Sequence, residues 1–362
     1  MGANEGHEAI VRAPFPVEGR RLLLLADGCF TSTEAKTAAC LAMYRASDVV
    51  AVLDRSRAGR SVRDVLGFGG DAPVVATIEE ALARKPEVAV VGTAPAGGEL
   101  DAAMRAHIER CLQAGIDIVS GMHAFISDDE RAMAMARASG ARVWDVRRVP
   151  EARLVSSGAG CTTGAKVVAT VGTDCNVGKM TVALELDRAA RACGVRSAWA
   201  ATGQTGIMLR GRGVPVDRLI ADFVGGVTQA LVDEEARDAD VVMVEGQGSI
   251  THPGYAGVTL GMLYGAMPDA MVLVHAAGRT RYKRFEHDIP PLPEVVALYE
   301  ALMRPYKKSR VAAIALNTHG LSDHDARRAL AHASDLTGLP AGDLVRFGAD
   351  PVWPALRATI GV

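Results

Sequence analysis

A strand, a glycine-rich loop and a helix follow one another at residues 167–181, VVATVGTDCNVGKMT. The apolar run leads into a G-x-x-x-x-G-K sequence, the pattern of a phosphate-binding loop when it joins a strand to a helix. The glycines let successive N–H groups point inward, the helix adds the positive end of its dipole, and the lysine adds a full charge. The residues expected to bind a cofactor here are Gly172, Thr173, Asp174, Cys175, Asn176, Val177, Gly178, Lys179, Met180 and Thr181.

The residue after the lysine departs from the usual pattern. Met180 stands where a Ser or Thr normally binds Mg²⁺, and Thr181 follows one position later. Because a helix turns by roughly 100° per residue, the Thr181 hydroxyl points elsewhere unless the loop changes its register. We therefore assign no metal ligands and leave Mg²⁺ open, and we expect a metal-free diphosphate, such as that of coenzyme A, to bind well.

A second apolar strand, expected at 240–244, ends in Glu245, and Gly246-Gln247-Gly248-Ser249 follows. An acid at a strand end beside a phosphate loop suits a metal-directing or proton-handling carboxylate; the alternative is a carboxylate that caps the glycine turn. His252 lies in the next loop, which is rich in hydroxyl groups and glycine, and it is either a base or a structural histidine. The candidate catalytic residues are Glu245, His252 and Lys179.

Other polar residues suit substrate binding. The basic cluster at 275–284 carries arginines, which bind carboxylates and phosphates in a bidentate manner, although it is equally well explained as a solvated loop. Asn317 ends a later strand, where its amide could read the edge of an adenine as part of the cofactor site. The candidate substrate-binding residues are Arg147, Arg148, Gln247, Ser249, Arg279 and Arg281.

Short apolar runs alternate with helical stretches along the chain, which is typical of a mostly parallel sheet with helices on both faces. Strands are expected at 22–26, 49–53, 88–91, 116–119, 142–144, 166–171, 195–200, 240–244, 270–274 and 311–316. Helices are expected at 34–44, 78–84, 100–114, 128–139, 179–193, 217–235, 293–303 and 322–335. The small polar stretch 156–164 reads as a linker. We therefore predict an α/β fold with a Rossmann-like N-terminal domain, 1–155, and a P-loop NTPase-like domain, 156–362.

The N-terminal half lacks the glycine pattern of a dinucleotide-binding enzyme. Its first strand leads into Asp27-Gly28-Cys29-Phe30 rather than G-x-G-x-x-G. Asp54 ends the second strand, where a ribose-binding acid would lie. Without the glycines we favour a structural role for Asp54, and the ligand of this domain is left open.

Charge and composition exclude several partners. The chain has 362 residues, a formal net charge of −2 and no basic block, which argues against nucleic acid and an anionic membrane surface. Its six cysteines are dispersed, and no apolar run approaches the roughly 18 residues of a membrane helix. We expect a cytoplasmic protein that acts on small molecules and forms a homo-oligomer, with a dimer as the expected form.

GTDCNVGK followed by VEGQGS resembles the dethiobiotin-synthetase-like branch of P-loop proteins over roughly the second half of the chain. Over nearly the whole chain, several segments together resemble a two-domain bacterial and archaeal family that includes D-glutamate N-acetyltransferases. These segments are Asp27-Gly28, Gly121-Met122-His123, Ser127-Asp128-Asp129-Glu130, Trp144-Asp145-Val146-Arg147-Arg148, GTDCNVGKMT and VEGQGSITHPGY. The resemblance implies acetyl-CoA as donor, D-glutamate as acceptor, and a role in amino-acid catabolism.

An acetyl transfer of this kind needs a base, because an ammonium group cannot attack a thioester. Lowering an amine pKa from near 10 to 7 corresponds to about 4 kcal/mol. Glu245 or His252 is expected to take the proton, and backbone N–H groups at 246–249 to bind the oxyanion. Cys175, whose thiol lies at a helix N-terminus, is an alternative covalent carrier of the acetyl group.

Two other functions fit the same motifs. One is a Mg²⁺-ATP-dependent ligase of the dethiobiotin-synthetase type, in which Lys179 and Glu245 would organise the nucleotide. The other is a non-catalytic nucleotide-binding regulator. Release of phosphate that depends on Mg²⁺ would identify the ligase, and tight nucleotide binding without turnover would identify the regulator.

Overall fold

The computed structural model describes residues 9–93, 98–149 and 151–362. These residues form two compact units, and each is described by itself. The Rossmann-like unit comprises Val11–Val149 and Gln204–Arg212, and the P-loop unit contains most of the remaining chain. Residues 204–212 follow a strand of the P-loop unit and yet pack in the other, so the units are not two continuous halves. The boundaries 1–155 and 156–362 stay a prediction.

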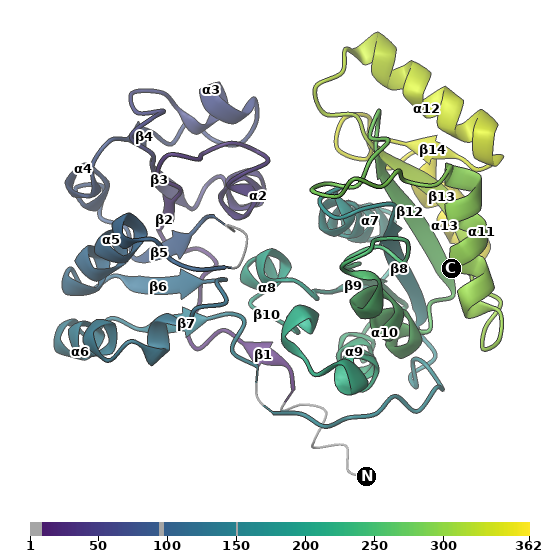
Figure 1. Cartoon of the computed structure of the whole chain (residues 1–362), viewed down its shortest axis with the longest axis horizontal. Coiled ribbons are helices and arrows are strands. Elements are labelled where there is room, and N and C mark those ends of the chain that lie inside the picture. Colours follow the sequence, from purple (N-terminus) through teal and green to yellow (C-terminus); the bar gives the residue numbers. More distant parts are fainter. Residues whose placement is uncertain (1–8, 94–97, 150) are drawn as a thin grey trace. The chain divides into compact units, whose positions relative to one another are not determined.

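The Rossmann-like unit is built on a six-stranded parallel sheet with the order β4-β3-β2-β5-β6-β7 (Figure 1). Its strands are β2 (Leu22–Leu25), β3 (Val49–Leu53), β4 (Val74–Val75), β5 (Val88–Val91), β6 (Asp117–Ser120) and β7 (Val143–Asp145). The order reverses between β2 and β5, as in doubly wound folds. The four leucines of β2 are completely buried because helices cover both faces, which explains the continuous apolar run in the sequence.

Short helices connect these strands. They are α2 (Lys36–Tyr44), α3 (Val62–Leu66), α4 (Ile78–Leu82), α5 (Ala102–Gln113) and α6 (Glu130–Ser139), and α8 (Gln204–Arg210) packs against α2. Side chains cap several of them: Asp101 accepts the N–H of Met104 at the start of α5. Asp129 caps α6 in the same way, and Gly140 ends it in the left-handed conformation.

The P-loop unit contains a second six-stranded parallel sheet, with the order β14-β13-β12-β8-β11-β9. The strands are β8 (Lys166–Gly172), β9 (Ser197–Ala200), β11 (Val241–Val244), β12 (Ala270–Ala276), β13 (Arg310–Asn317) and β14 (Ala341–Gly342). Val244 pairs with Ala169, and Val274 pairs with Gly172. Because the strands are parallel, the segments that follow β8, β11, β12 and β13 all begin at one edge of the sheet.

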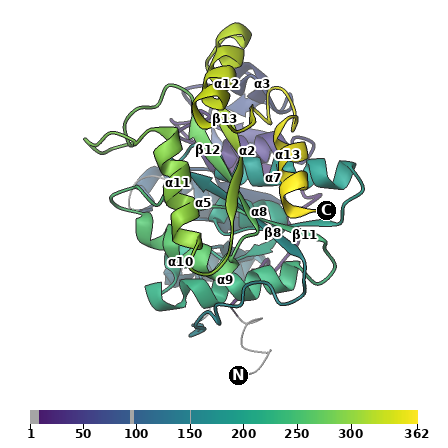
Figure 2. The same ribbon diagram turned by 90° about the vertical axis from the view of Figure 1, so that its right-hand side faces the viewer.

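The helices of the P-loop unit form two layers. One layer contacts the sheet through α9 (Ala221–Glu235), α10 (Ala256–Ala266), α11 (Leu292–Met303) and α12 (Asp323–Thr337). The other contains α7 (Lys179–Ala192) and α13 (Val352–Ile360), which contact each other. Figure 2 shows α11 and α13 on opposite sides of β13. In the part of the chain described here, no helix combines the length and apolar character that a membrane crossing requires.

The predicted α/β class and two-domain architecture are confirmed, and the predicted strands and long helices match within a few residues. Most shifted boundaries move by one or two residues, as at β6, which begins at Asp117 rather than at 116. The largest shift is in the helix expected at 217–235, which begins at Ala221 because Val216–Arg218 form a 3₁₀ turn. Helices α3, α8, α10 and α13 and strands β4 and β14 were missed. Apart from Thr259 and Tyr264, the residues of α10, AGVTLGMLYGA, are apolar or glycine on all sides, so they carry no helical period.

Helices α9 and α10 approach each other closely through glycines, and this contact is testable. A Cβ on Gly265 would lie 2.1 Å from the carbonyl oxygen of Gly225, whereas a Cβ on Gly257 of the same helix would meet nothing within 4 Å. We expect Gly265→Ala to destabilise the protein by about 3 kcal/mol through overpacking. Gly257→Ala should be neutral or stabilising by up to about 1 kcal/mol. Chemical denaturation of both variants measures this, and equal stability of the two would contradict the assigned helix contact.

Candidate phosphate-binding site

The loop between β8 and α7 has the backbone of a phosphate-binding loop. Asn176 and Gly178 have positive φ angles of 52° and 113°, and α7 begins directly afterwards at Lys179. Lys179 is buried and its Nζ donates a hydrogen bond to the carbonyl oxygen of Asp174, 2.8 Å away. A Cβ on Gly172 would lie 2.9 Å from that Nζ, so the first glycine of the motif makes room for the lysine. The predicted motif therefore forms a closed loop with its lysine directed back across it.

The side chain of Asp174 is completely buried at the centre of this site. Its Oδ1 accepts the N–H of Cys175 at 2.6 Å, and its Oδ2 accepts Arg279 Nη1 and the N–H of Lys283, each at 3.0 Å. Arg279 Nη1 also donates to the carbonyl oxygen of Cys175, 2.8 Å away. Asp174 and Arg279 thus tie the segment that follows β12 to the phosphate loop.

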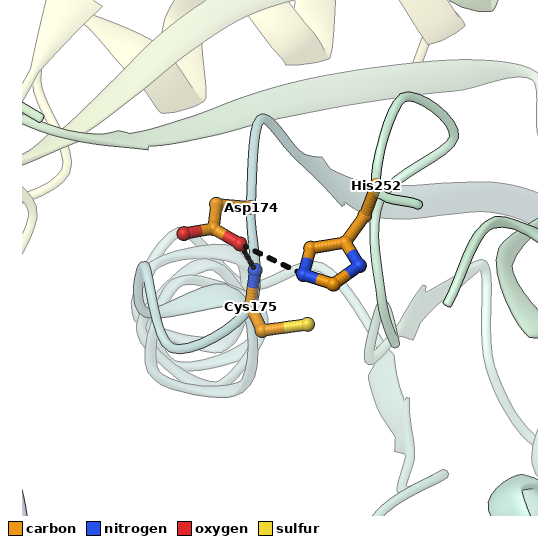
Figure 3. A group of neighbouring side chains, drawn as sticks. All are labelled: Asp174, Cys175 and His252. Atoms are coloured by element: carbon orange, nitrogen blue, oxygen red, sulfur yellow. Dashed lines mark hydrogen bonds and ion pairs between the residues drawn. The ribbon is translucent and has the colours of Figure 1, made fainter. Parts of the chain in front are cut away.

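His252 approaches the same carboxylate from the segment that follows β11. Its Nε2 lies 3.5 Å from Asp174 Oδ1 (Figure 3). Its Nδ1 accepts the N–H of Gly254 at 3.0 Å. Because an N–H group can only donate, Nδ1 carries the lone pair and the ring proton lies on Nε2, facing Asp174. Burial lowers the pKa of His252; the charge of Asp174 opposes this shift and Lys179 adds to it. The geometry favours one of the two roles expected for His252: a neutral histidine that positions Asp174, rather than a base.

Cys175 completes the group drawn in Figure 3. Its Sγ, a carboxylate oxygen of Asp174 and a ring nitrogen of His252 all lie within 4.8 Å of one another. These residue types suit a transition metal or a thiol nucleophile with an adjacent base. Both uses need a lone pair on Nε2, and hence a proton on Nδ1, where the N–H of Gly254 already points. The tautomer inferred from this hydrogen bond therefore does not activate the thiol.

Glu245 follows β11 and is 4% exposed. Its Oε2 accepts the N–H groups of Thr202 and Gly203 at 3.1 and 3.3 Å, and its Oε1 accepts Gln247 Nε2 at 2.9 Å. These donors hold the carboxylate in one orientation, and the Gln247 side chain serves to fix it there.

Gly246 brings this acid next to the phosphate loop. A Cβ on Gly246 would lie 1.7 Å from the carbonyl oxygen of Thr170 and 3.0 Å from Lys179 Cδ, so only glycine fits between them. The N–H of Gly246 donates to Thr170 Oγ1 at 3.0 Å and is therefore already engaged. This N–H group does not serve the oxyanion hole that was expected at 246–249.

Tyr299, on α11, contributes to the site and was missed by the sequence analysis. Its buried hydroxyl donates to the carbonyl oxygen of Gly172 at 2.8 Å and accepts the N–H of Ile250 at 3.0 Å. Burial raises the pKa of Tyr299 to about 12, so the hydroxyl stays protonated. Ser249 is buried in the same loop, and its Oγ lies 3.1 Å from Thr251 Oγ1. Tyr299 comes from the middle of an apolar helix, and no local signal in the sequence indicates its role.

The remaining predicted residues lie in different places. Asn317 ends β13, where its Oδ1 accepts the N–H of His319 at 3.0 Å. Arg281 is exposed and pairs with Asp288 at 3.1 Å, within its own loop, rather than with the phosphate loop. Arg147 and Arg148 belong to the Rossmann-like unit: the first donates to the carbonyl oxygen of Gly121, and the second pairs with Asp128 and stacks over Phe125.

The strand ends of the Rossmann-like unit are occupied by their own contacts. Asp54 is completely buried and accepts the N–H groups of Phe30 and Ser56, each at 2.7 Å. Its carboxylate therefore holds two turns rather than a ribose, in agreement with the structural role we favoured. Arg55 and His107 contact Asp27, and the hydrogen bond from Arg55 holds the pKa of Asp27 well below its usual range.

Comparison with known proteins places the chain in a family. Residues 154–353 match a P-loop domain and residues 55–149 match a Rossmann-like domain, the C- and N-terminal domains of unknown function of DUF1611. The chain belongs to the DUF1611 family. It is similar to a crystal structure of a DUF1611 family protein from Anabaena variabilis, with a TM-score of 0.90 and 40% identity over 94% of this chain and 100% of that one.

Two curated relatives carry a functional name. A protein from Tritonibacter scottomollicae named D-glutamate N-acetyltransferase is 38% identical over 78% of this DUF1611 chain and 84% of its own length. A protein of the same name from Pseudoalteromonas sp is 33% identical over 73% of this chain and 79% of its own length. The family expected from the sequence is confirmed, and its named members make the chain an enzyme of the acyltransferase class.

A histidine beside the phosphate loop makes stability depend on pH. His275 Nδ1 lies 2.8 Å from Thr173 Oγ1, and burial lowers the pKa of His275 to about 4 from 6.5. Between these values the unfolded chain binds the proton and the folded chain does not. The stability that neutral His275 contributes is therefore present above pH 6.5 and lost as the pH falls to 4.

We expect His275→Asn to lose less stability than the natural protein between pH 6.5 and 4, measured by denaturation at several pH values. His332→Asn, on the exposed side of α12, is the control, and an unchanged slope for His275→Asn would contradict the assignment.

Proposed function

We propose that the chain transfers the acetyl group of acetyl-CoA to the amine of D-glutamate, with the CoA diphosphate in the phosphate loop. The observation that carries the proposal is the 38% identity to a D-glutamate N-acetyltransferase over most of both chains. The loop supports it, since it combines the features of an anion site with Met180 at the position of the usual metal-binding hydroxyl. A diphosphate suits such a loop better than a Mg²⁺-bound triphosphate.

In the proposed reaction the amine nitrogen attacks the thioester carbonyl carbon. The new C–N bond forms as the C–S bond breaks, and the proton leaves the amine while CoA leaves as its thiol. Of the candidate bases, Glu245 fits better than His252, because the ring proton of His252 faces Asp174 and its Nδ1 accepts the N–H of Gly254. Glu245 is a carboxylate that Gln247 and the N–H groups of Thr202 and Gly203 hold in one orientation at the end of β11.

The acceptor carries two carboxylates that need cations. The side chain of Arg279 is 26% exposed beside the loop, so part of it is accessible from outside. Arg147, Arg148 and Arg281 remain proposed contacts as well. A cytoplasmic location, a small-molecule acceptor and a homo-oligomer belong to the same proposal.

The first test is turnover. We expect thiol release when the protein is mixed with acetyl-CoA and D-glutamate without Mg²⁺, and its absence with both glutamate enantiomers would refute the transfer. Release of phosphate from ATP that depends on Mg²⁺ would favour a ligase instead.

Glu245→Gln should lower kcat by about 10²–10⁴-fold, because a general base contributes that much, while the Kd for CoA changes little. Glu294→Gln, exposed in the first turn of α11, is the matched control. Full activity of Glu245→Gln would rule out Glu245 as the base.

The histidine tautomer inferred from the Gly254 contact also predicts the behaviour of Cys175. If the thiol is not the acetyl carrier, Cys175→Ser should keep activity within about threefold, because the hydroxyl fills nearly the same space and the amine attacks acetyl-CoA directly. The intact mass of the natural protein mixed with acetyl-CoA alone should show no added acetyl group. An acetylated species that disappears in Cys175→Ser, together with loss of turnover, would establish the covalent route.

A further inference from the structure

Four aromatic rings gather beside the phosphate loop, on the segments that follow β11 and β12. The His252 ring stacks on Tyr255 with centroids 4.7 Å apart, and it meets the edges of Phe285 and Tyr282 at 4.9 and 5.3 Å. His252 and Tyr282 are buried, whereas Tyr255 is 52% and Phe285 37% exposed. Tyr255 and Phe285 together form what we call the aromatic surface.

The aromatic surface is held in place rather than carried on a loose loop. Phe285 lies in a hairpin closed by hydrogen bonds from Ile289 N to Thr280 O at 2.8 Å and from Tyr282 N to His287 O at 3.1 Å. At its tip, Arg284 has a φ of 71°, which is uncommon for a residue other than glycine. Next to it, the N–H of Lys283 donates to Asp174. The hairpin tip is thus fixed to the phosphate loop by the buried carboxylate.

The aromatic surface continues directly from the phosphate loop. The His252 ring contacts both Tyr255 and Phe285, and its Nε2 lies 3.5 Å from Asp174 Oδ1 in the loop. A long ligand held by the loop could therefore extend over Tyr255 and Phe285. Exposed aromatic rings gain about 25 cal/mol per Å² when apolar groups cover them. D-Glutamate, with two carboxylates, is a poor match for these rings. An acyl carrier has a diphosphate followed by a pantetheine arm, whose paired methyl groups and flat amides pack well on aromatic faces.

We propose that Tyr255 and Phe285 receive the pantetheine arm of the acyl carrier. The inference rests on the proposed function, because it places the carrier's diphosphate in the adjoining loop. Lys283 and Arg284 precede Phe285 and Glu286 follows it, all three exposed, so two cations and one acid lie beside this ring and their sum favours an anionic carrier. The surface thereby distinguishes a pantetheine-bearing ligand from a nucleotide that has the same diphosphate and no arm.

The test compares two ligands by calorimetry: coenzyme A, and adenosine 3′-phosphate 5′-diphosphate, which lacks the arm. We expect Tyr255→Ala and Phe285→Ala each to weaken CoA binding by about tenfold and to leave the truncated ligand unaffected. Tyr255→Phe keeps the ring and should bind CoA as the natural protein does. Tyr306→Ala is the matched control, since Tyr306 is a tyrosine of the same unit that is 60% exposed.

The outcomes separate this inference from the proposed function. If the natural protein binds CoA and both alanine variants bind it equally well, the inference is wrong and the proposed function stands. Equal losses for CoA and the truncated ligand would also overturn it, because the rings would then act on the loop and not on the arm. Failure of the natural protein to bind CoA at all would instead refute the proposed function.

Discussion

The buried carboxylate of Asp174 is the interaction on which the site of this protein depends. A charge without solvent is costly unless it is paired and hydrogen-bonded, and Asp174 satisfies this with Arg279, two backbone N–H groups and the Nε2 proton of His252. Removing one partner would leave the carboxylate charge of Asp174 less well paired in a low-dielectric interior. The contacts with Asp174 therefore stabilise the arrangement of the segments that follow β8, β11 and β12. This connection ties the phosphate loop to the segments that follow β11 and β12.

The histidine beside this carboxylate shows how one backbone contact bears on the chemistry of a group that looks catalytic. Cysteine, histidine and aspartate within 4.8 Å have the composition of a nucleophilic triad. What decides their chemistry is the N–H of Gly254, which occupies Nδ1 and leaves the proton on Nε2. A single backbone donor, invisible as a sequence pattern, thus places His252 better to support Asp174 than to act as the base, which stays a prediction to be tested.

Sequence patterns predicted the local parts of this molecule well. The phosphate loop, the strand that ends at Glu245 and the parallel architecture follow from β-branched runs, glycine spacing and strand order, all of which are local signals. Helix α10 was missed because its apolar residues have no period, and Tyr299 because its partners are 49 and 127 residues away. The pairing of Asp174 with Arg279 spans 105 residues, and no spacing rule connects them.

The same geometry bears on the order of events in the proposed transfer. Glu245 is fixed by the N–H of Thr202, after β9, and by Gln247. Gly246, next to it, lies close to the side chain of Lys179. The proposed base and the lysine of the phosphate loop thus follow neighbouring strands of one sheet, β11 and β8. If Glu245 is the base, its fixed orientation requires the substrate amine to be brought to it. A carrier anchored at its diphosphate meets that requirement, because the anchor fixes one end and lets the arm bring the thioester to the acceptor amine. Direct attack in a complex of both substrates therefore uses the site as built, whereas a covalent route would first have to move the proton of His252.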